Sequence, residues 1–247
     1  GNLVLNKHNN TPNSPMNTIV KIISPKIDLK RFFDGTDPSL VIKDLAEIGN
    51  IDSRDALYIY PEGILPSINL NEIQDYSSVF GNYFQNNHKI IIGITRYKET
   101  EIFNSMALLD NDLKLISVYD KNKLVPFGEY LPFENFLKNY GFKKITQGYQ
   151  SFSSASERDL IKMNDTKFLP LICYEIIYSG GLYKYSDNYD FIINISEDGW
   201  FGKSIGIDQH FYHSIFRSIE EGKNIIRSAN NGICLLYTSD AADDTDS

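Results

Sequence analysis

The chain has 247 residues, of which 42% are hydrophobic and 23% are charged, and its formal net charge is −8 at neutral pH. This composition is ordinary for a globular protein with one large core, and it argues against the basic surface of a nucleic-acid-binding protein. The two cysteines, Cys173 and Cys234, form no CxxC motif, which argues against a disulfide framework or a cysteine zinc site, and no run of about 18 apolar residues predicts a transmembrane helix.

The first half of the sequence alternates β-branched runs with amphipathic ones. Residues 1–17 are polar and asparagine-rich and include two prolines, which is typical of a linker. The elements expected after it are, in chain order, a strand at 18–23, a helix at 37–49, a strand at 56–60, a helix at 71–84, a strand at 89–94 and a hairpin of strands 105–109 and 113–119. The helix at 71–84 carries an aromatic stripe, which we assign to core packing.

The second half opens on a segment that suits neither helix nor strand. Residues 121–133, KNKLVPFGEYLPF, contain many prolines and glycines, and 134–165 are expected to form a long loop region with some helix. The elements expected next are a strand at 168–172, a strand at 191–195, a helix at 207–221 and strands at 224–229 and 233–236. Because strands alternate with helices apart from one hairpin, we predict a mixed-sheet α/β fold.

The helix at 207–221 has two features that bear on its role. Its apolar face is expected to consist of Ile207, Phe211, Ile215 and Ile219, at i, i+4 spacing. His210 and His213 lie three residues apart on it but lack the acidic partner of an HExxH motif. We therefore interpret both as core or surface histidines, with metal ligation as the weaker alternative, and we predict no metal site.

Three of the predicted strands are followed by a side chain that can take part in chemistry, namely Glu62, Lys121 and Cys173. A cysteine nucleophile needs a base, which a carboxylate supplies, and a lysine ammonium can stabilise both a thiolate and an oxyanion. Each residue also has an ordinary interpretation. Glu62 could cap a helix, Lys121 could be a solvated loop charge, and Cys173 could be a buried core cysteine.

Several longer motifs resemble the nitrilase superfamily. They are PEG at 61–63, KLVPFGEYLPF at 123–133, CYEIIY at 173–178, NISEDGWFG at 194–202, DQHF at 208–211 and RSANNG at 227–232. Within that superfamily they are most similar to the apolipoprotein N-acyltransferase branch, and the resemblance extends from Ile19 to Cys234. It implies an α-β-β-α sandwich with mixed sheets, and it assigns a Glu–Lys–Cys triad to Glu62, Lys121 and Cys173.

The resemblance implies roles for five further residues. Glu129, in PFGEY, resembles a second essential acid close to the triad, and Tyr174 and Glu175 resemble substrate-site residues that flank the nucleophile. Trp200 and Phe201 resemble the aromatic part of a loop near the entrance for the acyl chain. These two aromatic residues could equally be a hydrophobic anchor that holds the loop to the core.

The activity implied by the resemblance is the transfer of a fatty acyl group from a phospholipid to the N-terminal amine of a diacylglyceryl-cysteine lipoprotein, through a cysteine thioester. No cofactor is implied, and the expected location is the outer, periplasmic face of a bacterial inner membrane. The alternative is a soluble nitrilase-type amidase, which would use water with the same triad. A third possibility is a non-catalytic scaffold domain, against which the intact triad argues.

The sequence departs from that branch at both ends. Family members carry a multi-helix membrane domain before this region, which we expect to be missing here, and further strands after the NNG turn. We therefore expect a catalytic domain at 18–236 whose C-terminal strands are truncated near Cys234. Residues 237–247 are expected to be a disordered and foreign tail, because Thr238–Ser247 offers no large apolar side chain to bury.

Overall fold

The computed structural model describes residues 2–4, 19–32, 35, 37–51, 53–130, 132, 151–180, 182 and 188–237. The strands are β1 (Asn2–Val4), β2 (Ile19–Ile22), β3 (Ala56–Ile59), β4 (His88–Lys98), β5 (Glu101–Asp110), β6 (Leu115–Asp120), β7 (Ile161–Met163), β8 (Thr166–Ile172), β9 (Phe191–Glu197), β10 (Asn224–Asn230) and β11 (Leu235–Tyr237). The helices are α1 (Pro38–Gly49), α2 (Ser77–Gly81) and α4 (Gly206–Glu221), and the 3₁₀ turns are η1 (Leu29–Phe32), η2 (Ile73–Tyr76), η3 (Cys173–Ile177) and η5 (Asp198–Phe201).

The strands form two mixed sheets. The first has the order β1-β2-β3-β4-β5-β6, with β2, β3 and β4 parallel and the other pairs antiparallel. The second has the order β11-β10-β9-β8-β7, with β8, β9 and β10 parallel and an antiparallel strand at each edge. Parallel strands covered on both faces require continuous apolar runs, and all seven residues of β9 are indeed buried.

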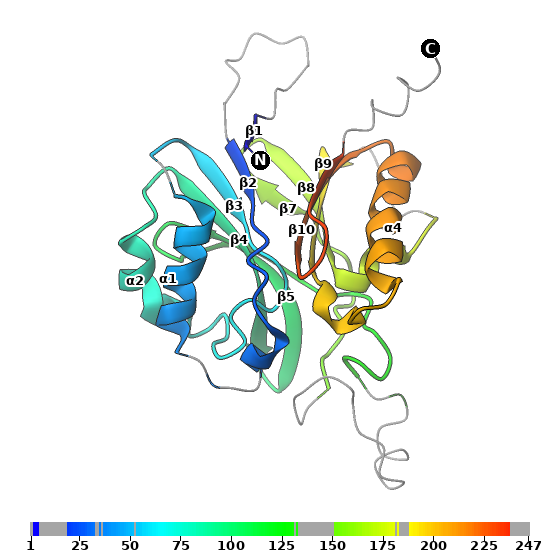
Figure 1. Ribbon diagram of the computed structural model, residues 1–247, viewed down its shortest axis with the longest axis horizontal. Coiled ribbons are helices and arrows are strands. Elements are labelled where there is room, and N and C mark those ends of the chain that lie inside the picture. The colour runs from blue at the N-terminus through cyan, green and yellow to red at the C-terminus, as the bar shows by residue number, and fades with distance from the viewer. Residues whose placement is uncertain are drawn as a thin grey trace, which may run out of the picture.

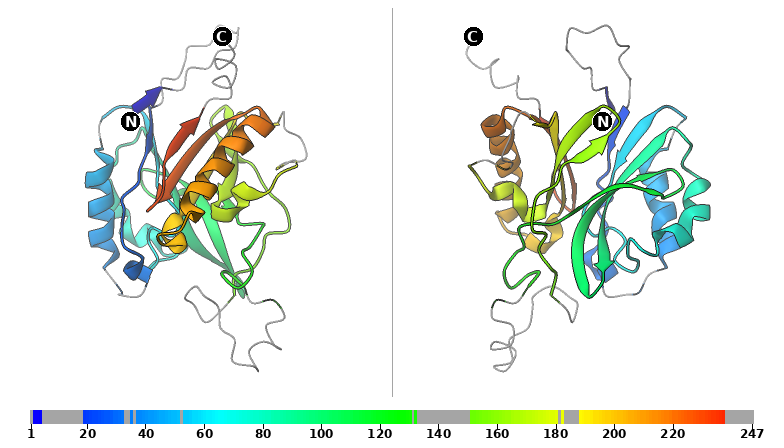
Figure 2. Two further views of the ribbon diagram at one scale, coloured as in Figure 1. Left: turned by 45° about the vertical axis from the view of Figure 1, so that its right-hand side comes forward. Right: turned by 180° about the vertical axis from the view of Figure 1, so that it is seen from behind.

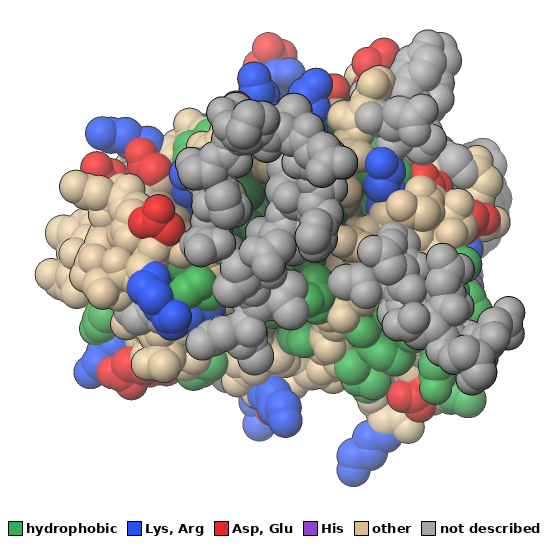
Figure 3. All heavy atoms as spheres, turned by 90° about the horizontal axis from the view of Figure 1, so that it is seen from above, with side chains coloured by type: hydrophobic (Ala, Val, Ile, Leu, Met, Phe, Trp, Pro, Cys, Tyr) green, Lys and Arg blue, Asp and Glu red, His purple; other side chains and the backbone are tan. Residues whose placement is uncertain are grey.

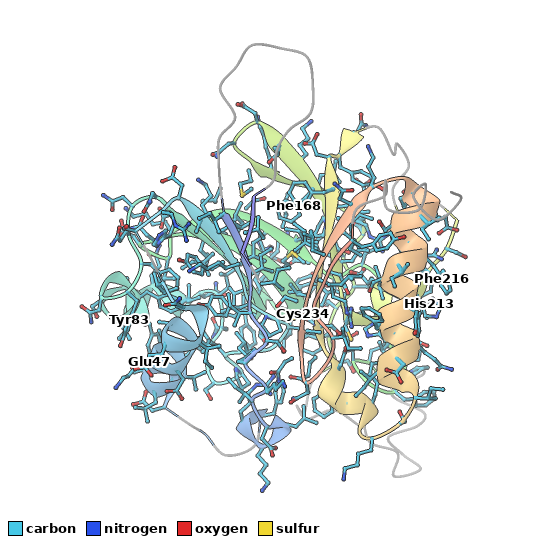
Figure 4. The ribbon with its side chains drawn as sticks, turned by 45° about the horizontal axis from the view of Figure 1, so that its top comes forward. Glu47, Tyr83, Phe168, His213, Phe216 and Cys234 are labelled. Carbon is cyan, nitrogen blue, oxygen red and sulfur yellow. The ribbon has the colours of Figure 1, made fainter. Side chains whose placement is uncertain are left out.

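The two sheets face each other, and helices cover their outer faces (Figures 1 and 2). Leu57 and Ile91 of the first sheet share a buried cluster with Phe168 and Ile193 of the second, and Figure 4 shows Phe168 in this inner layer. The helices α1 and α2 cover the outer face of the first sheet, whereas α4 lies against the second (Figure 1). The α-β-β-α sandwich expected from the resemblance is confirmed.

Local sequence explains how α1 is held. The Asp37 side chain accepts a hydrogen bond from the Ser39 N–H at 2.9 Å, and Pro38 occupies the first helical position, where no donor is needed. At the other end Asn50 adopts a left-handed conformation, and the Lys21 ammonium of β2 donates to the Asn50 carbonyl. A lysine beside the last carbonyls of a helix also complements its dipole.

The helix expected at 71–84 is shorter than predicted. The segment is the 3₁₀ turn η2 followed by the five-residue helix α2, which ends at Gly81 because glycine and the asparagine after it are weak helix formers. The interpretation of the aromatic stripe as core is confirmed for Phe80 and Phe84, which are buried with ring centroids 5.5 Å apart.

The buried face of α4 differs from the predicted one. Its buried residues are polar, namely His210, Ser214, Arg217 and Ser218. Ile219 of the predicted apolar face is 50% exposed, and Phe216 points away from the sheets (Figure 4). Ile207, Phe211 and Ile215 are half-buried, so the fully buried face of the helix is offset from the predicted apolar one.

Three segments expected to lack regular structure fall partly outside the described residues. The expected linker at 1–17 includes β1, which pairs with β2, whereas residues 5–18 are not among those described. The expected loop region at 134–165 includes β7, but 133–150 lie outside the description. In the C-terminal part, β11 continues the second sheet to Tyr237, and the remaining residues, 238–247, are also outside it.

The surface seen from above mixes charges of both signs. In Figure 3, lysine and arginine side chains lie between acidic ones around the rim of this face, and apolar side chains lie among them. Interspersed charges of this kind differ from the one-sided basic patch that binds nucleic acid.

Gly93 is the point at which β4 passes closest to the segment after β3. An alanine there would place its Cβ 2.5 Å from the Cα of Glu62 and 2.9 Å from Ile195 Cδ1. We expect Gly93→Ala to destabilise the fold by about 1–3 kcal/mol in guanidinium unfolding, because the backbone at Glu62 must move. Gly81→Ala is the matched control, since its Cβ would meet nothing within 4 Å. Equal stability of the two variants would contradict this packing.

Candidate active site

Glu62 lies at the junction of the two sheets. It follows β3 by three residues, and its side chain is mostly enclosed. One carboxylate oxygen accepts a hydrogen bond from the Asn104 amide of β5 at 2.7 Å, and the other accepts from the Glu197 backbone N–H of β9 at 3.1 Å. Groups from both sheets therefore fix the orientation of this carboxylate.

Lys121 is buried between two carboxylates. Its ammonium nitrogen lies 2.9 Å from one oxygen of Glu129 and 3.0 Å from the other, and 3.7 Å from Glu62 Oε1. Asn104 also donates to Glu129 at 2.7 Å, so its amide group bridges the two acids. The Val125 N–H donates to Glu129 as well, at 2.9 Å. The Pro/Gly-rich segment after β6 thus folds back to place Glu129 on Lys121.

Cys173 begins the turn η3 directly after β8. It has a left-handed φ of 49°, which costs a residue with a Cβ about 1 kcal/mol or more unless its surroundings hold it there. The residue is half-buried, and the Ser196 side chain also acts on the pKa of its thiol, which it lowers. The charges of Glu62, Lys121 and Glu129 all act on this thiol.

The shared burial shifts the pKa of each of these groups. Burial raises the pKa of the Cys173 thiol, and the Glu62 charge adds to that effect while Lys121 opposes it. Burial also raises the pKa of Glu62, against the opposing charge of Lys121. For Lys121, burial works against the ammonium, but the carboxylates Glu129 and Glu62 outweigh it and raise the pKa above its ordinary value. A protonated thiol beside a carboxylate of raised pKa suits proton transfer between the two.

Glu175, which was expected to contact substrate, is instead fully enclosed. One of its oxygens accepts from the Tyr119 hydroxyl at 2.7 Å, the Lys123 N–H at 3.0 Å and Arg158 Nη2 at 3.2 Å. The other accepts from the Ile172 N–H at 2.9 Å. This carboxylate ties the segment after Lys121 to the turn that carries Cys173, so its bonds serve positioning.

The three aromatic candidates surround the site rather than enter the charged cluster. The Tyr174 and Phe201 rings lie 6.2 Å and 5.2 Å from the His210 ring. Trp200 is 39% exposed, and its ring lies 5.4 Å from that of Phe32. These contacts leave both expectations for Trp200 and Phe201, entrance and anchor, compatible with the structure.

Sequence reasoning missed Asn104 and undervalued His210. Asn104 lies inside β5 and belongs to no motif. The only sign of its role in the sequence is that it is a polar residue within a half-buried strand. His210 belongs to the DQHF motif and is 2% exposed, as a core histidine should be. Within the described residues, no three acidic, histidine or cysteine side chains are grouped so as to hold a metal ion.

The raised pKa of Glu62 gives a pH-dependent prediction for Glu62→Gln. Below the ordinary glutamate pKa of 4.5, Glu62 is protonated in both the folded and the unfolded chain, so its burial does not bury a charge. As the pH rises, the unfolded chain ionises first, so the wild type loses stability that the neutral glutamine retains. We expect the free energy of unfolding of Glu62→Gln, relative to wild type, to rise between pH 5 and pH 8 in urea titrations.

Glu47→Gln is the control for this titration. Glu47 lies on the solvent side of α1 (Figure 4), with a side chain that is 61% exposed. Its replacement should show no such rise. A pH-independent difference for Glu62→Gln would show that Glu62 is not held as described.

Known proteins match both the sequence and the fold. The family model "Carbon-nitrogen hydrolase" matches residues 83–244. Apolipoprotein N-acyltransferase from Rhizobium rhizogenes is 32% identical over 228 residues, which are 87% of this chain and 43% of that protein. The Brucella suis protein of the same name is 30% identical over 89% of this chain and 43% of its own length. The chain thus spans less than half the length of these relatives.

No helix in the part of the chain that is described has both the length and the apolarity to cross a membrane.

Solved structures show the same fold at low sequence identity. A CN-hydrolase superfamily protein from Xanthomonas campestris superposes with a TM-score of 0.60 at 13% identity, over 89% of this chain and 82% of that one. A glutamine-dependent NAD⁺ synthetase from Acinetobacter baumannii gives 0.59 at 14% identity, over 89% of this chain and 41% of that one. The strand order, the arrangement of the two sheets and the family match agree, and the chain belongs to the carbon-nitrogen hydrolase family.

Proposed function

We propose that this chain is the catalytic part of an apolipoprotein N-acyltransferase. It would move a fatty acyl group from a phospholipid to the N-terminal amine of a diacylglyceryl-cysteine lipoprotein. The observation that carries the proposal is the ion-paired cluster of Glu62, Lys121 and Glu129, whose charges all act on the Cys173 thiol. The sequence relatives, which bear the name of this transferase, support the choice of reaction.

In the first half-reaction, Cys173 attacks the ester carbonyl of the phospholipid. Because burial keeps the thiol protonated, Glu62 takes its proton as the sulfur–carbon bond forms. The Lys121 ammonium and a backbone N–H stabilise the oxyanion. The tetrahedral intermediate then expels the lysophospholipid alkoxide, which receives the proton from Glu62, and a thioester remains on Cys173.

In the second half-reaction, the amine of the lipoprotein attacks the thioester carbonyl. Glu62 accepts a proton from the attacking nitrogen, and the same oxyanion site is used again. The carbon–sulfur bond breaks, an amide is released, and the thiolate recovers its proton from Glu62. Hydrogen bonds from the Asn104 amide and the Glu197 N–H hold the Glu62 carboxylate in one orientation. This supports a base that serves both half-reactions without moving.

The remaining site residues have supporting roles in this scheme. Glu129 keeps the Lys121 charge in place, and Glu175 positions the chain on either side of Lys121 and Cys173. We assign Tyr174, Trp200 and Phe201 to the side on which the acyl chain arrives. Since both the donor and the acceptor carry lipid chains, we propose that the domain acts on the outer face of a bacterial inner membrane.

The test uses p-nitrophenyl octanoate as a soluble acyl donor, so that it needs no membrane. We expect a burst of p-nitrophenolate and an added acyl mass on the peptide that holds Cys173, released by hydroxylamine. Cys173→Ser should abolish the adduct. Cys234→Ser is the matched control and should keep it, because Cys234 packs near Ala229, away from the charged cluster. Lys121→Ala should slow acylation by about a hundredfold or more.

The fate of the adduct separates the two activities. A transferase should pass the acyl group to a diacylglyceryl-cysteinyl peptide faster than to water. An amidase should instead lose it to water and hydrolyse simple amides. An adduct on Cys234, or a burst that survives in Cys173→Ser, would overturn the nucleophile and the two-step scheme.

A further inference from the structure

A second cluster of buried charged and polar side chains lies under α4, and the proposed mechanism does not use it. Arg227 of β10 and Asp198 of η5 are fully buried, and His210 of α4 is 2% exposed. Arg227 Nη2 lies 2.7 Å from Asp198 Oδ2, and His210 Nδ1 lies 2.9 Å from Asp198 Oδ1. The cluster unites three motifs of the sequence, NISEDGWFG, DQHF and RSANNG, of which only the first contains a residue with an expected role.

The backbone and the helix α4 both pack closely against this cluster. Gly232, in RSANNG, approaches Asp198 so closely that an added Cβ would lie 2.0 Å from Asp198 Oδ2. The inward side of α4 is polar at His210, which explains why the predicted apolar face of that helix is not the buried one. Buried charges without partners are costly, and here the Arg227 guanidinium and the Asp198 carboxylate supply each other's partner.

The cluster converges on the backbone of Cys173. His210 Nε2 lies 3.1 Å from the Cys173 carbonyl oxygen, and Asn194 Nδ2, whose amide oxygen accepts from Arg227, lies 3.5 Å from the same oxygen. Carbonyl and carboxylate oxygens only accept, so His210 makes both bonds as the donor, from Nε2 to the Cys173 carbonyl and from Nδ1 to Asp198. The Ser196 hydroxyl donates to Asp198 Oδ1 at 2.7 Å and so belongs to the same cluster.

These contacts bear on a residue that needs to be held. Cys173 has a left-handed φ, a conformation that persists in a residue with a Cβ only when its surroundings determine it. In a trans peptide the carbonyl and the following N–H point in opposite directions. Fixing the Cys173 carbonyl therefore also fixes the direction of the Tyr174 N–H, which is a candidate for the backbone donor to the oxyanion.

We propose that His210, held by Asp198 and Arg227, is a positioning residue that fixes the Cys173 carbonyl and thereby aligns the thiol and the Tyr174 N–H for acyl transfer. The inference rests on the proposed role of Cys173 as the nucleophile. His210 touches neither substrate nor sulfur in this scheme, and it acts through the peptide that joins Cys173 to Tyr174.

Two isosteric variants separate the two bonds of His210. In His210→Asn, the amide nitrogen replaces Nδ1 and keeps the bond to Asp198, but nothing reaches the Cys173 carbonyl. In His210→Gln, the amide nitrogen replaces Nε2 and keeps the bond to that carbonyl. We expect His210→Asn to lower the saturating rate of acylation by p-nitrophenyl octanoate about tenfold or more, because small misplacements of a nucleophile are costly. His210→Gln should stay within about threefold of wild type, and neither variant should change the half-saturating ester concentration.

The control is His213→Asn, the same substitution one turn along α4 and outside the cluster, which should acylate like wild type. Equal rates in all variants, or equal losses in the Asn and Gln variants of His210, would overturn the proposal. Glu62→Gln, measured alongside, reports on the base that activates the nucleophile: if it acylates at the wild-type rate, the proposed function fails rather than the positioning.

If His210→Asn does not fold, a measurement on the wild-type protein tests whether His210 Nε2 donates to the Cys173 carbonyl. An imidazole Nε2–H that donates to a buried carbonyl exchanges slowly and gives a downfield proton resonance. We expect that signal in the wild type and its loss in His210→Gln, independently of any acyl transfer. Its absence from the wild-type spectrum would overturn the proposal.

Discussion

The ion pair between the Lys121 ammonium and the Glu129 carboxylate is the interaction on which the rest of the site depends. Both groups are buried, and both oxygens of Glu129 lie within 3.0 Å of the nitrogen. Removing Lys121 would leave two carboxylates inside the sandwich without a cation. With Glu62 3.7 Å away, one cation serves two carboxylates. The surplus negative charge helps to raise the pKa of Glu62, although burial is the larger cause. Burial of these charged groups therefore both lowers the stability of the fold and raises the pKa of Glu62, which makes this residue a stronger base for proton transfer.

The sandwich architecture makes this arrangement possible. Glu62 comes from the first sheet and Cys173 from the second, and bonds such as that from the Glu197 N–H to Glu62 cross between them. Positioning groups surround both residues: Glu175 fixes the chain on either side of Lys121 and Cys173, and the Arg227–Asp198–His210 cluster reaches the Cys173 carbonyl. Networks of this kind are satisfied as a unit, so the loss of one member weakens the others.

The sequence was sufficient to locate the central strands along the chain and the charged residues that follow them. Apolar runs marked β3, β6 and β8, and Glu62, Lys121 and Cys173 follow these three strands. Predictions from the sequence were wrong or incomplete where contacts between distant segments determine the structure. The periodicity of α4 could not reveal that its inward side would meet Arg227 and Asp198. Asn104 was invisible because its bonds to Glu62 and Glu129 join segments 42 and 25 residues apart. Glu175 matched a motif, but only the fold shows that its carboxylate is enclosed.

The most direct test of the Lys121–Glu129 interaction is a double-mutant cycle on stability. Lys121→Met and Glu129→Gln keep the approximate shapes of the side chains and remove one charge each, and the double variant removes both. Free energies of unfolding of the four proteins would be measured by urea titration at pH 8. The account predicts a coupling of more than about 1 kcal/mol, with the double variant more stable than the sum of the single losses implies. Losses that add to within about 0.5 kcal/mol would contradict it, because independent residues behave in that way.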